Sequence, residues 1–168
     1  WVCGPKSALW ILAQLTGMPY GSIRDLLGSD ESHERPKIAR KKGLVLPTGL
    51  GELLSVHNTY LEGRGFNPAI LTRLWGIQGI GLAPRLAWRI WIPVTLRGEV
   101  VSWTTRGTNS KARRYVNARP MEEAWPIKHL LYGEDLARHA VVVMEGPTDC
   151  WRVGPGAVCT FGTACTDW

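Results

Sequence analysis

The clearest apolar pattern in the chain is a short run near its carboxyl-terminal end, HAVVVMEGPTDCW (139–151). Its four residues VVVM (141–144) do not alternate with polar residues, which is typical of a strand buried on both faces in a mostly parallel sheet. Glu145 follows, Gly146 permits a tight reversal, and Pro147 suits the first position of a helix. Ligands of open α/β sheets collect beyond the carboxyl ends of the strands. The pattern therefore predicts a strand, a carboxylate at a ligand-binding edge, and a helix.

Helical patterns dominate the amino-terminal part of the chain. Residues 8–16 and 19–27 are predicted to form two short helices, because Gly17 and Gly28 stand where a helix end usually needs a left-handed residue. The polar stretch GSDESHERPKIARKKG (28–43) contains a cluster of basic residues and is typical of an exposed connector. A basic connector can bind a polyanion or simply be solvated, and the sequence leaves both open.

Two more helices are predicted before the strands begin. The first ends at Gly63 and places its apolar residues on one face. The second has Asn67 as its N-cap, Pro68 at its first position and Gly76 as its end. The face of the first helix consists of Leu50, Leu53, Leu54, His57, Tyr60 and Leu61.

The pattern changes from helix to strand after residue 88. Two runs rich in β-forming residues within 89–106 predict a hairpin whose turn contains Gly98. The basic stretch KARRYVNARP (111–120) is predicted to be extended, IKHLLYGEDLARH (127–139) to be a helix, and AVCTF (157–161) to be a second strand. This order predicts an α+β fold, in which a helical and β-hairpin basic subdomain leads into an incomplete α/β sheet.

Composition limits the class of protein. A chain of 168 residues can form one domain or two small ones in contact. No apolar run approaches the roughly 20 residues of a bilayer helix, and ALWILAQL (8–15) has no convincing signal-peptide cleavage site after it. We therefore expect a cytoplasmic protein without membrane contact. Because the chain begins with Trp1 and ends at Trp168, close after a strand-like segment, we also expect a fragment of a longer protein.

Charge and cysteine usage narrow the choice of partners. The formal net charge of +6 favours polyanionic partners, although a basic face can also be merely solvated. The four cysteines form no C-x-x-C pair, and the histidines are scattered, so no zinc pattern is complete. We expect buried free thiols in a reducing compartment. The four cysteines are Cys3, Cys150, Cys159 and Cys165.

Three sequence blocks in a fixed order carry a resemblance to a known family. They are YLEGRGFNPAIL (60–71), RRYVNARP before IKHLLYGEDLAR (113–138), and VVVMEGPTD (141–149). Together they resemble the bacterial-type replicative DNA primases, including their phage relatives. In that family the first block lies in the basic subdomain of the RNA-polymerase core, and the last opens the Toprim fold. The ordered combination is specific, although E-G-x-x-D alone is weak.

The resemblance implies a division of the chain into three parts. Residues 1–47 would be a helical segment and basic linker that follow a possible zinc ribbon. Residues 48–138 would be the amino-terminal basic subdomain, and residues 139–168 the truncated start of a Toprim domain. Zinc could bind only in a missing amino-terminal region, because Cys3 alone cannot hold it.

The resemblance also implies an activity. Primases join ribonucleoside triphosphates into RNA primers on a single-stranded DNA template, and we expect a replicative helicase as partner in a bacterial cell or phage-infected host. Mg²⁺ or Mn²⁺ bound by acidic residues would activate the attacking hydroxyl and stabilise the leaving pyrophosphate. Glu145 matches the motif glutamate and is the expected metal-associated acid/base. Asp149 matches the second acidic position, but it could instead stabilise the amino terminus of the helix that begins at Pro147.

The chain departs from the family pattern in its acidic residues. A later strand of Toprim enzymes carries an Asp-x-Asp pair, whereas the only acid after Asp149 here is Asp167. We therefore expect only half of the metal site. One carboxylate binds two mutually repelling dications poorly. We expect weak divalent binding and no primer synthesis from these 168 residues alone.

Several basic or amide residues match positions near nucleotide and template phosphates in the family. They are Arg106, Arg114, Asn117 and Lys128. Relatives usually carry lysine at the position of Arg114, and a guanidinium can replace it because it binds phosphate with two hydrogen bonds. Arg64 and Arg73 could follow the template backbone or be solvated. Tyr115 could stack on a base or pack beside its neighbours.

Two other functions remain open from the sequence. Another Toprim protein, of the topoisomerase or nuclease type, would share the glutamate motif, although the blocks before residue 140 speak against it. A nonenzymatic single-stranded nucleic-acid-binding module would use the basic segments and leave Glu145 inert. Salt dependence of binding and a Glu145→Gln change distinguish these possibilities.

Overall fold

The computed structural model describes residues 17–19, 22, 43–138 and 141–162. The chain divides into two compact units, Trp1–Ile38 and Ala39–Trp168, and the description below concerns the second. The helices predicted within residues 8–27 and nearly all of the basic connector lie outside the described residues.

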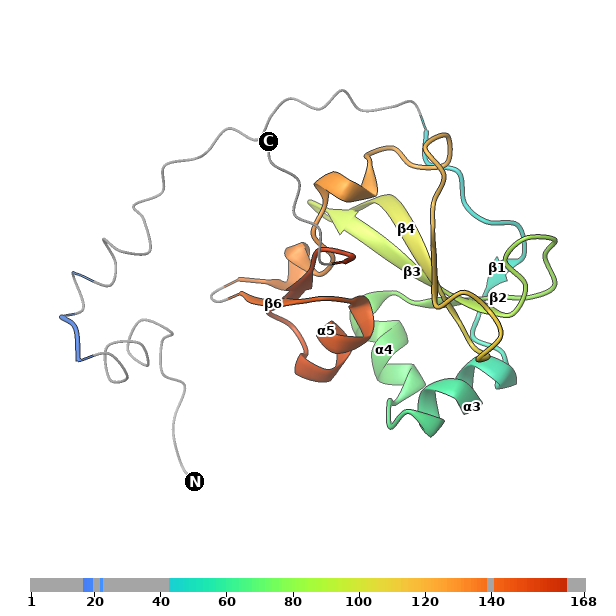
Figure 1. The fold of residues 1–168 in the computed structure, drawn as a ribbon, viewed down its shortest axis with the longest axis horizontal. Coiled ribbons are helices and arrows are strands. Elements are labelled where there is room, and N and C mark those ends of the chain that lie inside the picture. The colour runs from blue at the N-terminus through green and yellow to red at the C-terminus, as the bar shows by residue number, and fades with distance from the viewer. Residues whose placement is uncertain (1–16, 20–21, 23–42, 139–140, 163–168) are drawn as a thin grey trace. The chain divides into compact units, whose positions relative to one another are not determined.

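The described part of the second unit is an α+β structure, which confirms the predicted fold class (Figure 1). It contains a five-stranded antiparallel sheet, a two-stranded parallel sheet, three α-helices and two short 3₁₀ helices. In chain order the elements are β1 (Leu50–Gly51), α3 (Ser55–Gly63), α4 (Pro68–Trp75), β2 (Gln78–Ile80), β3 (Arg89–Leu96), β4 (Glu99–Gly107), β5 (Tyr115–Asn117), η1 (Ile127–His129), η2 (Glu134–Leu136), β6 (Val142–Met144), α5 (Pro147–Val153) and β7 (Ala157–Cys159).

The hairpin of β3 and β4 forms the centre of the larger sheet. Its turn residues Arg97 and Gly98 both have positive φ angles, 56° and 79°, as a two-residue turn needs to match the strand twist. The carboxylate of Asp135 accepts hydrogen bonds from both of their N–H groups, at 2.8 and 2.9 Å. The basic stretch that was predicted to be extended forms β5, which pairs with β4. Both strand predictions are therefore confirmed.

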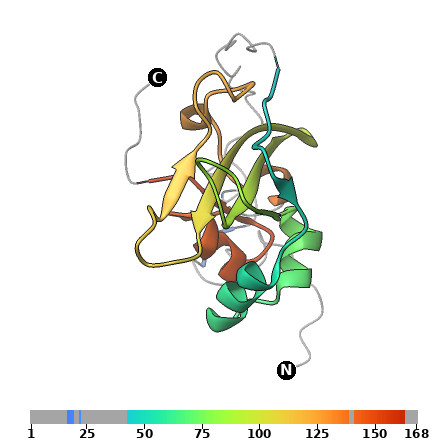
Figure 2. The ribbon, with the colours of Figure 1, turned by 90° about the vertical axis from the view of Figure 1, so that its right-hand side faces the viewer.

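The two faces of the larger sheet are buried against different partners. Ile90 and Ile92 of β3 belong to a core that includes residues of α3, α4, α5 and β7. Figures 1 and 2 show these three helices gathered on the same side of the β3–β4 hairpin. Because side chains alternate along a strand, Trp91 points to the opposite face, where it packs with Trp103 and Ile80. The helix-covered face is the one that forms the site described below.

The ends of α3 and α4 follow local sequence features. The side chain of Asn67 accepts a hydrogen bond from the N–H of Ile70 at 3.1 Å, and Gly76 ends α4 in a left-handed conformation with φ 64°. These observations confirm the predicted caps. Helix α3 ends at Gly63 as predicted but begins only at Ser55, because Leu50 lies in β1 and pairs with Ile80. None of the described helices is both long and apolar enough to cross a membrane.

The helix predicted over residues 127–139 is wrong. This segment forms η1 and η2, separated by extended Leu130 and by Gly133, whose φ is 80°. Between them the backbone of Tyr132 exchanges two hydrogen bonds with Cys159 of β7, at 3.0 and 3.1 Å. The Tyr132 ring also stacks on Trp75 at a centroid distance of 5.1 Å. Tertiary pairing and ring stacking therefore outweigh the local helical pattern.

The valine-rich segment forms a strand, β6, but the prediction that it is buried on both faces is wrong. Val141, Val142 and Val143 have exposed fractions of 57%, 48% and 65%. Strand β6 pairs in parallel with β7, so the predicted parallel arrangement is correct. Within the described residues β7 is its sole strand partner, and a two-stranded sheet leaves one edge of β6 unpaired.

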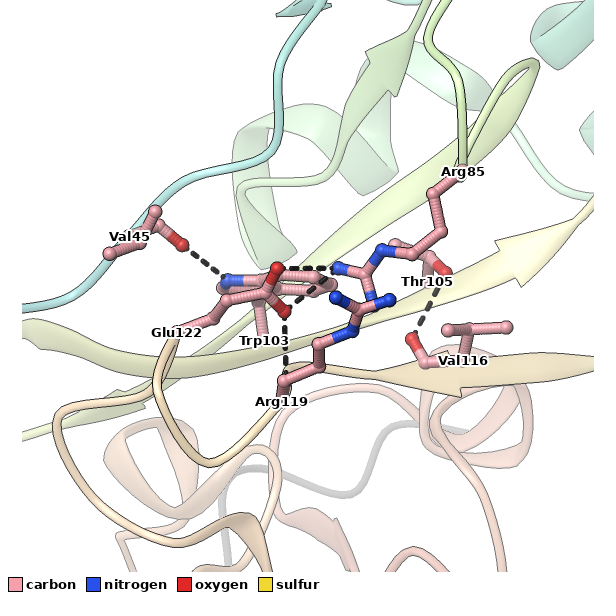
Figure 3. A network of polar contacts seen from close by, with 7 residues as sticks. All are labelled: Val45, Arg85, Trp103, Thr105, Val116, Arg119 and Glu122. Atoms are coloured by element: carbon pink, nitrogen blue, oxygen red, sulfur yellow. Dashed lines mark hydrogen bonds and ion pairs between the residues drawn. The ribbon is translucent and has the colours of Figure 1, made fainter.

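A polar network fixes the segments that flank the larger sheet on the Trp103 face (Figure 3). The carboxylate of Glu122 accepts two hydrogen bonds from the guanidinium of Arg85, at 2.7 and 2.8 Å, and one from the N–H of Arg119 at 2.8 Å. The indole N–H of Trp103 donates to the carbonyl of Val45 at 2.9 Å. These contacts hold the segments before β1 and after β5 against the sheet.

Candidate functional site

A pocket of about 730 Å³ lies where the helix-covered face of the larger sheet meets β6 and the start of α5. Strand register explains its sheet side. Arg106 of β4 lies opposite Ile90 of β3 and Tyr115 of β5, and Thr104 lies opposite Asn117, so their side chains share one face. The lining residues are Arg64, Thr104, Arg106, Arg113, Arg114, Tyr115, Val116, Asn117, Glu145, Gly146, Pro147, Thr148, Asp149, Phe161 and Gly162.

Arg106 is the most constrained cation of the pocket, with an exposed fraction of 8%. Its Nε donates a hydrogen bond to the Tyr60 hydroxyl at 2.8 Å, and its guanidinium lies 4.9 Å from the ring centroid of Tyr115. The Tyr60 ring is 5.9 Å away. Aromatic faces stabilise a cation without neutralising it. The described contacts of Arg106 are with tyrosines and not with a carboxylate, so its charge is available to an anion that enters the pocket.

The acidic residues come from the strand–turn–helix unit. Glu145, directly after β6, is exposed to solvent in the pocket, and among the residues that the structure describes it has no hydrogen-bond or ion-pair partner. One carboxylate oxygen of Asp149 accepts a hydrogen bond from the N–H of Gly146 at 3.2 Å. This contact agrees with the helix-terminus alternative for Asp149. The neighbouring Thr148 hydroxyl shares a hydrogen bond with the Tyr115 hydroxyl at 3.1 Å.

Exposed arginines complete the pocket. Arg64 follows α3, and Arg113 and Arg114 precede β5. The carbonyl of Arg64 accepts a hydrogen bond from the guanidinium of Arg152 at 2.6 Å, which ties the α3–α4 turn to α5. With Arg106, four arginines face two carboxylates in this pocket. An excess of guanidinium groups favours phosphate, which they can bind with paired hydrogen bonds.

The structure brings together most of the predicted site residues. Glu145, Asp149, Arg64, Arg106, Arg114 and Asn117 all line the pocket. Lys128 does not, because it lies in η1 with an exposed side chain. Arg73 lies on α4 beside a second groove, away from this pocket. The roles of all these residues remain predictions.

Sequence reasoning missed several residues of the site. Arg113 also lines the pocket, and its place in the basic stretch could have indicated it. The helical pattern predicts only a place on a helix face for Tyr60, whereas its hydroxyl accepts the bond from Arg106 across 46 positions of sequence. Thr104 and Thr148 carry no sequence pattern that points to a site.

The described residues do not form a complete metal site. Glu145 and Asp149 are the two carboxylates of the pocket, and within the described part of the chain no group of three or more His, Cys, Asp or Glu side chains could hold a metal ion. Mg²⁺ requires near-octahedral oxygen ligands, and two metals require several carboxylates. Asp167 lies outside the described residues. The donor set therefore does not fit a two-metal centre.

Two of the cysteines lie close to the site. Cys150 of α5 and Cys159 of β7 are free thiols with no exposed surface. A hydrogen bond between the two thiols lowers the pKa of Cys150, and the same contact together with burial raises the pKa of Cys159. These two residues confirm the expectation of buried free thiols, and Cys3 and Cys165 lie outside the described residues.

The fold resembles part of the catalytic core of bacterial primases. A DnaG primase catalytic domain bound to single-stranded DNA matches with a TM-score of 0.55 and 19% identity, over 67% of this chain and 48% of that one. The RNA polymerase domain of Mycobacterium tuberculosis primase DnaG matches with a TM-score of 0.54 and 22% identity, over 67% and 51%. The E. coli primase catalytic core matches with 0.54 and 18%, over 66% and 49%.

These matches concern the fold. The chain spans about half the length of the solved structures that it resembles. Searches with family models and among curated proteins found no match.

Proposed function

We propose that this chain is the amino-terminal part of a DNA primase core, which synthesises RNA primers from ribonucleoside triphosphates on a single-stranded DNA template. The observation that carries the proposal is the meeting of Glu145 and Asp149 with the arginines of one pocket. The two carboxylates follow β6, and the arginines come from segments far from them in the chain. The similar fold of a primase domain bound to single-stranded DNA supports the choice of template.

In this proposal each group of pocket residues has a separate task. Buried Arg106 binds a phosphate of the incoming nucleotide, because its aromatic neighbours leave its charge uncompensated. Exposed Arg64, Arg113 and Arg114 contact the template backbone. The side-chain oxygen of Asn117 accepts a bond from Thr104 at 2.7 Å, so its amide N–H₂ is left to donate to a ligand.

Glu145 is the proposed acid/base of the reaction. Its carboxylate is accessible and without a partner among the described residues, so it can accept a proton from an attacking 3′-hydroxyl. Mg²⁺ or Mn²⁺ would supply charge stabilisation at the leaving pyrophosphate in the whole enzyme, but further acidic ligands are needed there. We also propose a cytoplasmic location and a replicative helicase as partner.

The test uses the whole protein from which this chain derives. We expect Glu145→Gln to reduce primer synthesis by about 100-fold or more, as loss of general acid–base catalysis does, while affinity for single-stranded DNA changes little. Glu62→Gln, at an exposed carboxylate of α3 outside the pocket, serves as the matched control and should retain activity. Unchanged primer synthesis by Glu145→Gln would refute the assignment.

One observation favours a second candidate function, a nonenzymatic module that binds single-stranded nucleic acid. The described donor set does not fit a two-metal centre, whereas the pocket arginines need no metal ion to bind a polyanion. In that case Glu145→Gln would leave all measurable functions unchanged, and binding would respond only to salt.

A further inference from the structure

Arg89 is a buried arginine next to the pocket that does not line it. It begins β3, with an exposed fraction of 6%. In the sheet register it lies opposite Gly107, two positions from Trp91, so its side chain is on the face opposite to Arg106. A role in direct ligand contact is therefore excluded by its position.

The guanidinium of Arg89 binds the chain segment that carries the pocket arginines. Its Nε donates to the Thr105 hydroxyl at 2.7 Å. Its Nη2 donates to three carbonyls, those of Thr105 at 3.1 Å, Arg113 at 2.8 Å and Arg114 at 3.3 Å. Arg113 and Arg114 line the pocket, and Arg89 holds their backbone from the other face of the sheet.

The energetics of this contact require an arginine. A buried cation is costly unless its N–H groups are paired, and converging carbonyl dipoles pair them without cancelling the charge. Burial and the neighbouring charge of Arg106 lower the pKa of Arg89, but a guanidinium stays protonated in proteins. A lysine ammonium lacks the planar fork that reaches a hydroxyl and three carbonyls together.

The loop between β4 and β5 packs closely against Gly107. A Cβ atom at Gly107 would lie 2.8 Å from the Arg113 carbonyl oxygen and 3.2 Å from Nη1 of Arg89. The N–H of Gly107 donates to the carbonyl of Arg114 at 3.0 Å. The loop between β4 and β5 therefore folds directly onto the start of β3.

We propose that Arg89 is a positioning residue that fixes the backbone of Arg113 and Arg114 so that both guanidinium groups face a nucleic-acid phosphate chain in the pocket. This inference rests on the proposed function, because it assigns the pocket to a polyanionic ligand. Arg89 acts through the two arginines and touches no ligand itself.

The experiment compares Arg89→Lys with the unaltered chain, using a fluorescent oligothymidylate as probe. We expect affinity at low salt to fall about 3- to 10-fold. The negative slope of log K against log salt should become shallower by about 0.7 to 1.4, as for one or two lost phosphate contacts on a single strand. Arg97→Lys, in the exposed hairpin turn, is the matched control and should match the unaltered chain.

A double-mutant cycle separates positioning from a general loss of structure. In the Arg113→Ala/Arg114→Ala background, Arg89→Lys should cause no further loss of affinity, because the two guanidinium groups that Arg89 positions are absent. An equal loss in both backgrounds, or an unchanged salt slope in the folded single variant, would overturn the proposal. If Arg89→Lys does not fold, Thr105→Val, which removes the Nε acceptor, should produce a smaller change of the same kind, and an unchanged slope there would overturn the proposal.

A second measurement distinguishes failure of this inference from failure of the proposed function. Trypsin cleavage after Arg113 and Arg114 in the native protein should be faster in Arg89→Lys than in Arg97→Lys, because the released loop becomes accessible. If the unaltered chain does not bind the oligothymidylate but this difference appears, the polyanion assignment fails and Arg89 still fixes the loop. Equal cleavage rates would refute the positioning role.

Discussion

At the scale of single residues, two tyrosines surround the guanidinium of Arg106. Tyr60 reaches it from α3 and Tyr115 from β5, so one guanidinium lies close to two aromatic rings from separate elements. The Tyr60 hydroxyl accepts the bond from Nε, and no acidic residue among those described takes that place. The site therefore combines a buried positive charge with two aromatic rings that pack beside it.

This arrangement predicts the effect of Tyr60→Phe. The variant keeps the ring but leaves Nε of Arg106 without its acceptor, which costs about 1 to 3 kcal/mol of unfolding free energy, as for other buried unpaired polar groups. Urea denaturation measures this change. Tyr115→Phe is the control, because it removes only the bond to Thr148 and keeps the ring beside Arg106. Equal stability of Tyr60→Phe and the unaltered chain would contradict the importance of this contact.

At the scale of elements, α3 depends on a buried histidine. Nδ1 of His57 accepts a hydrogen bond from the N–H of Leu54 at 2.9 Å, which requires this nitrogen to be unprotonated. The side chain has no exposed surface, and its burial lowers the pKa of His57 below the usual value of 6.5. The start of α3 therefore relies on neutral imidazole.

The lowered pKa predicts a loss of stability in mild acid. The unfolded chain binds a proton at His57 near pH 6.5, whereas the folded chain resists it, so the stabilisation is complete above this pH and decreases as the pH falls below it. Urea denaturation between pH 8 and pH 5 measures the effect. His57→Gln should lose this part of the pH dependence, and exposed His129→Gln should retain it. Identical pH profiles for His57→Gln and the unaltered chain would contradict the prediction.

At the scale of the whole molecule, the pocket contains the groups proposed to bind phosphate but, among the described residues, too few ligands for a two-metal site. Four arginines and an amide are in place, whereas the described acidic groups number too few for two divalent cations. We therefore expect the proposed binding and the proposed catalysis to be separable.

This separation predicts the behaviour of the 168-residue chain alone. We expect it to bind single-stranded DNA with a slope of log K against log salt of about −2 to −3, as for three or four phosphate contacts, and to make no primers. Millimolar Mg²⁺ should weaken binding only as added salt does. Anisotropy titrations and a primer-synthesis assay measure these properties. Template-dependent RNA synthesis by this chain would show that the described donor set is sufficient after all.

Local sequence patterns predicted the features that depend on a few adjacent residues. The caps of α4, the turn of the β3–β4 hairpin and the strand–turn–helix unit around Glu145 all follow from backbone preferences of Asn, Pro and Gly. The resemblance to primases predicted seven site residues, and the structure places six of them in one pocket, with Lys128 as the exception.

Long-range packing decided the rest. Residues 127–139 have a helical apolar pattern, yet the backbone pairing of Tyr132 with Cys159 divides them into two 3₁₀ helices. The valines of β6 have the composition of an interior strand, but burial depends on which neighbours cover a strand, and composition does not specify neighbours. The bonds from Arg89 to the carbonyls of Arg113 and Arg114 likewise join residues 24 and 25 positions apart.

The sequence by itself determined the class of fold, the type of most elements, and the chemistry available at the end of β6, because these depend on side-chain type and local periodicity. The tertiary structure alone decided which cations meet Glu145, how Arg106 keeps its charge, and how the loop before β5 is held. Those properties depend on register and distance between segments far apart in the chain, which hydrophobic and hydrogen-bonding patterns along the sequence do not fix.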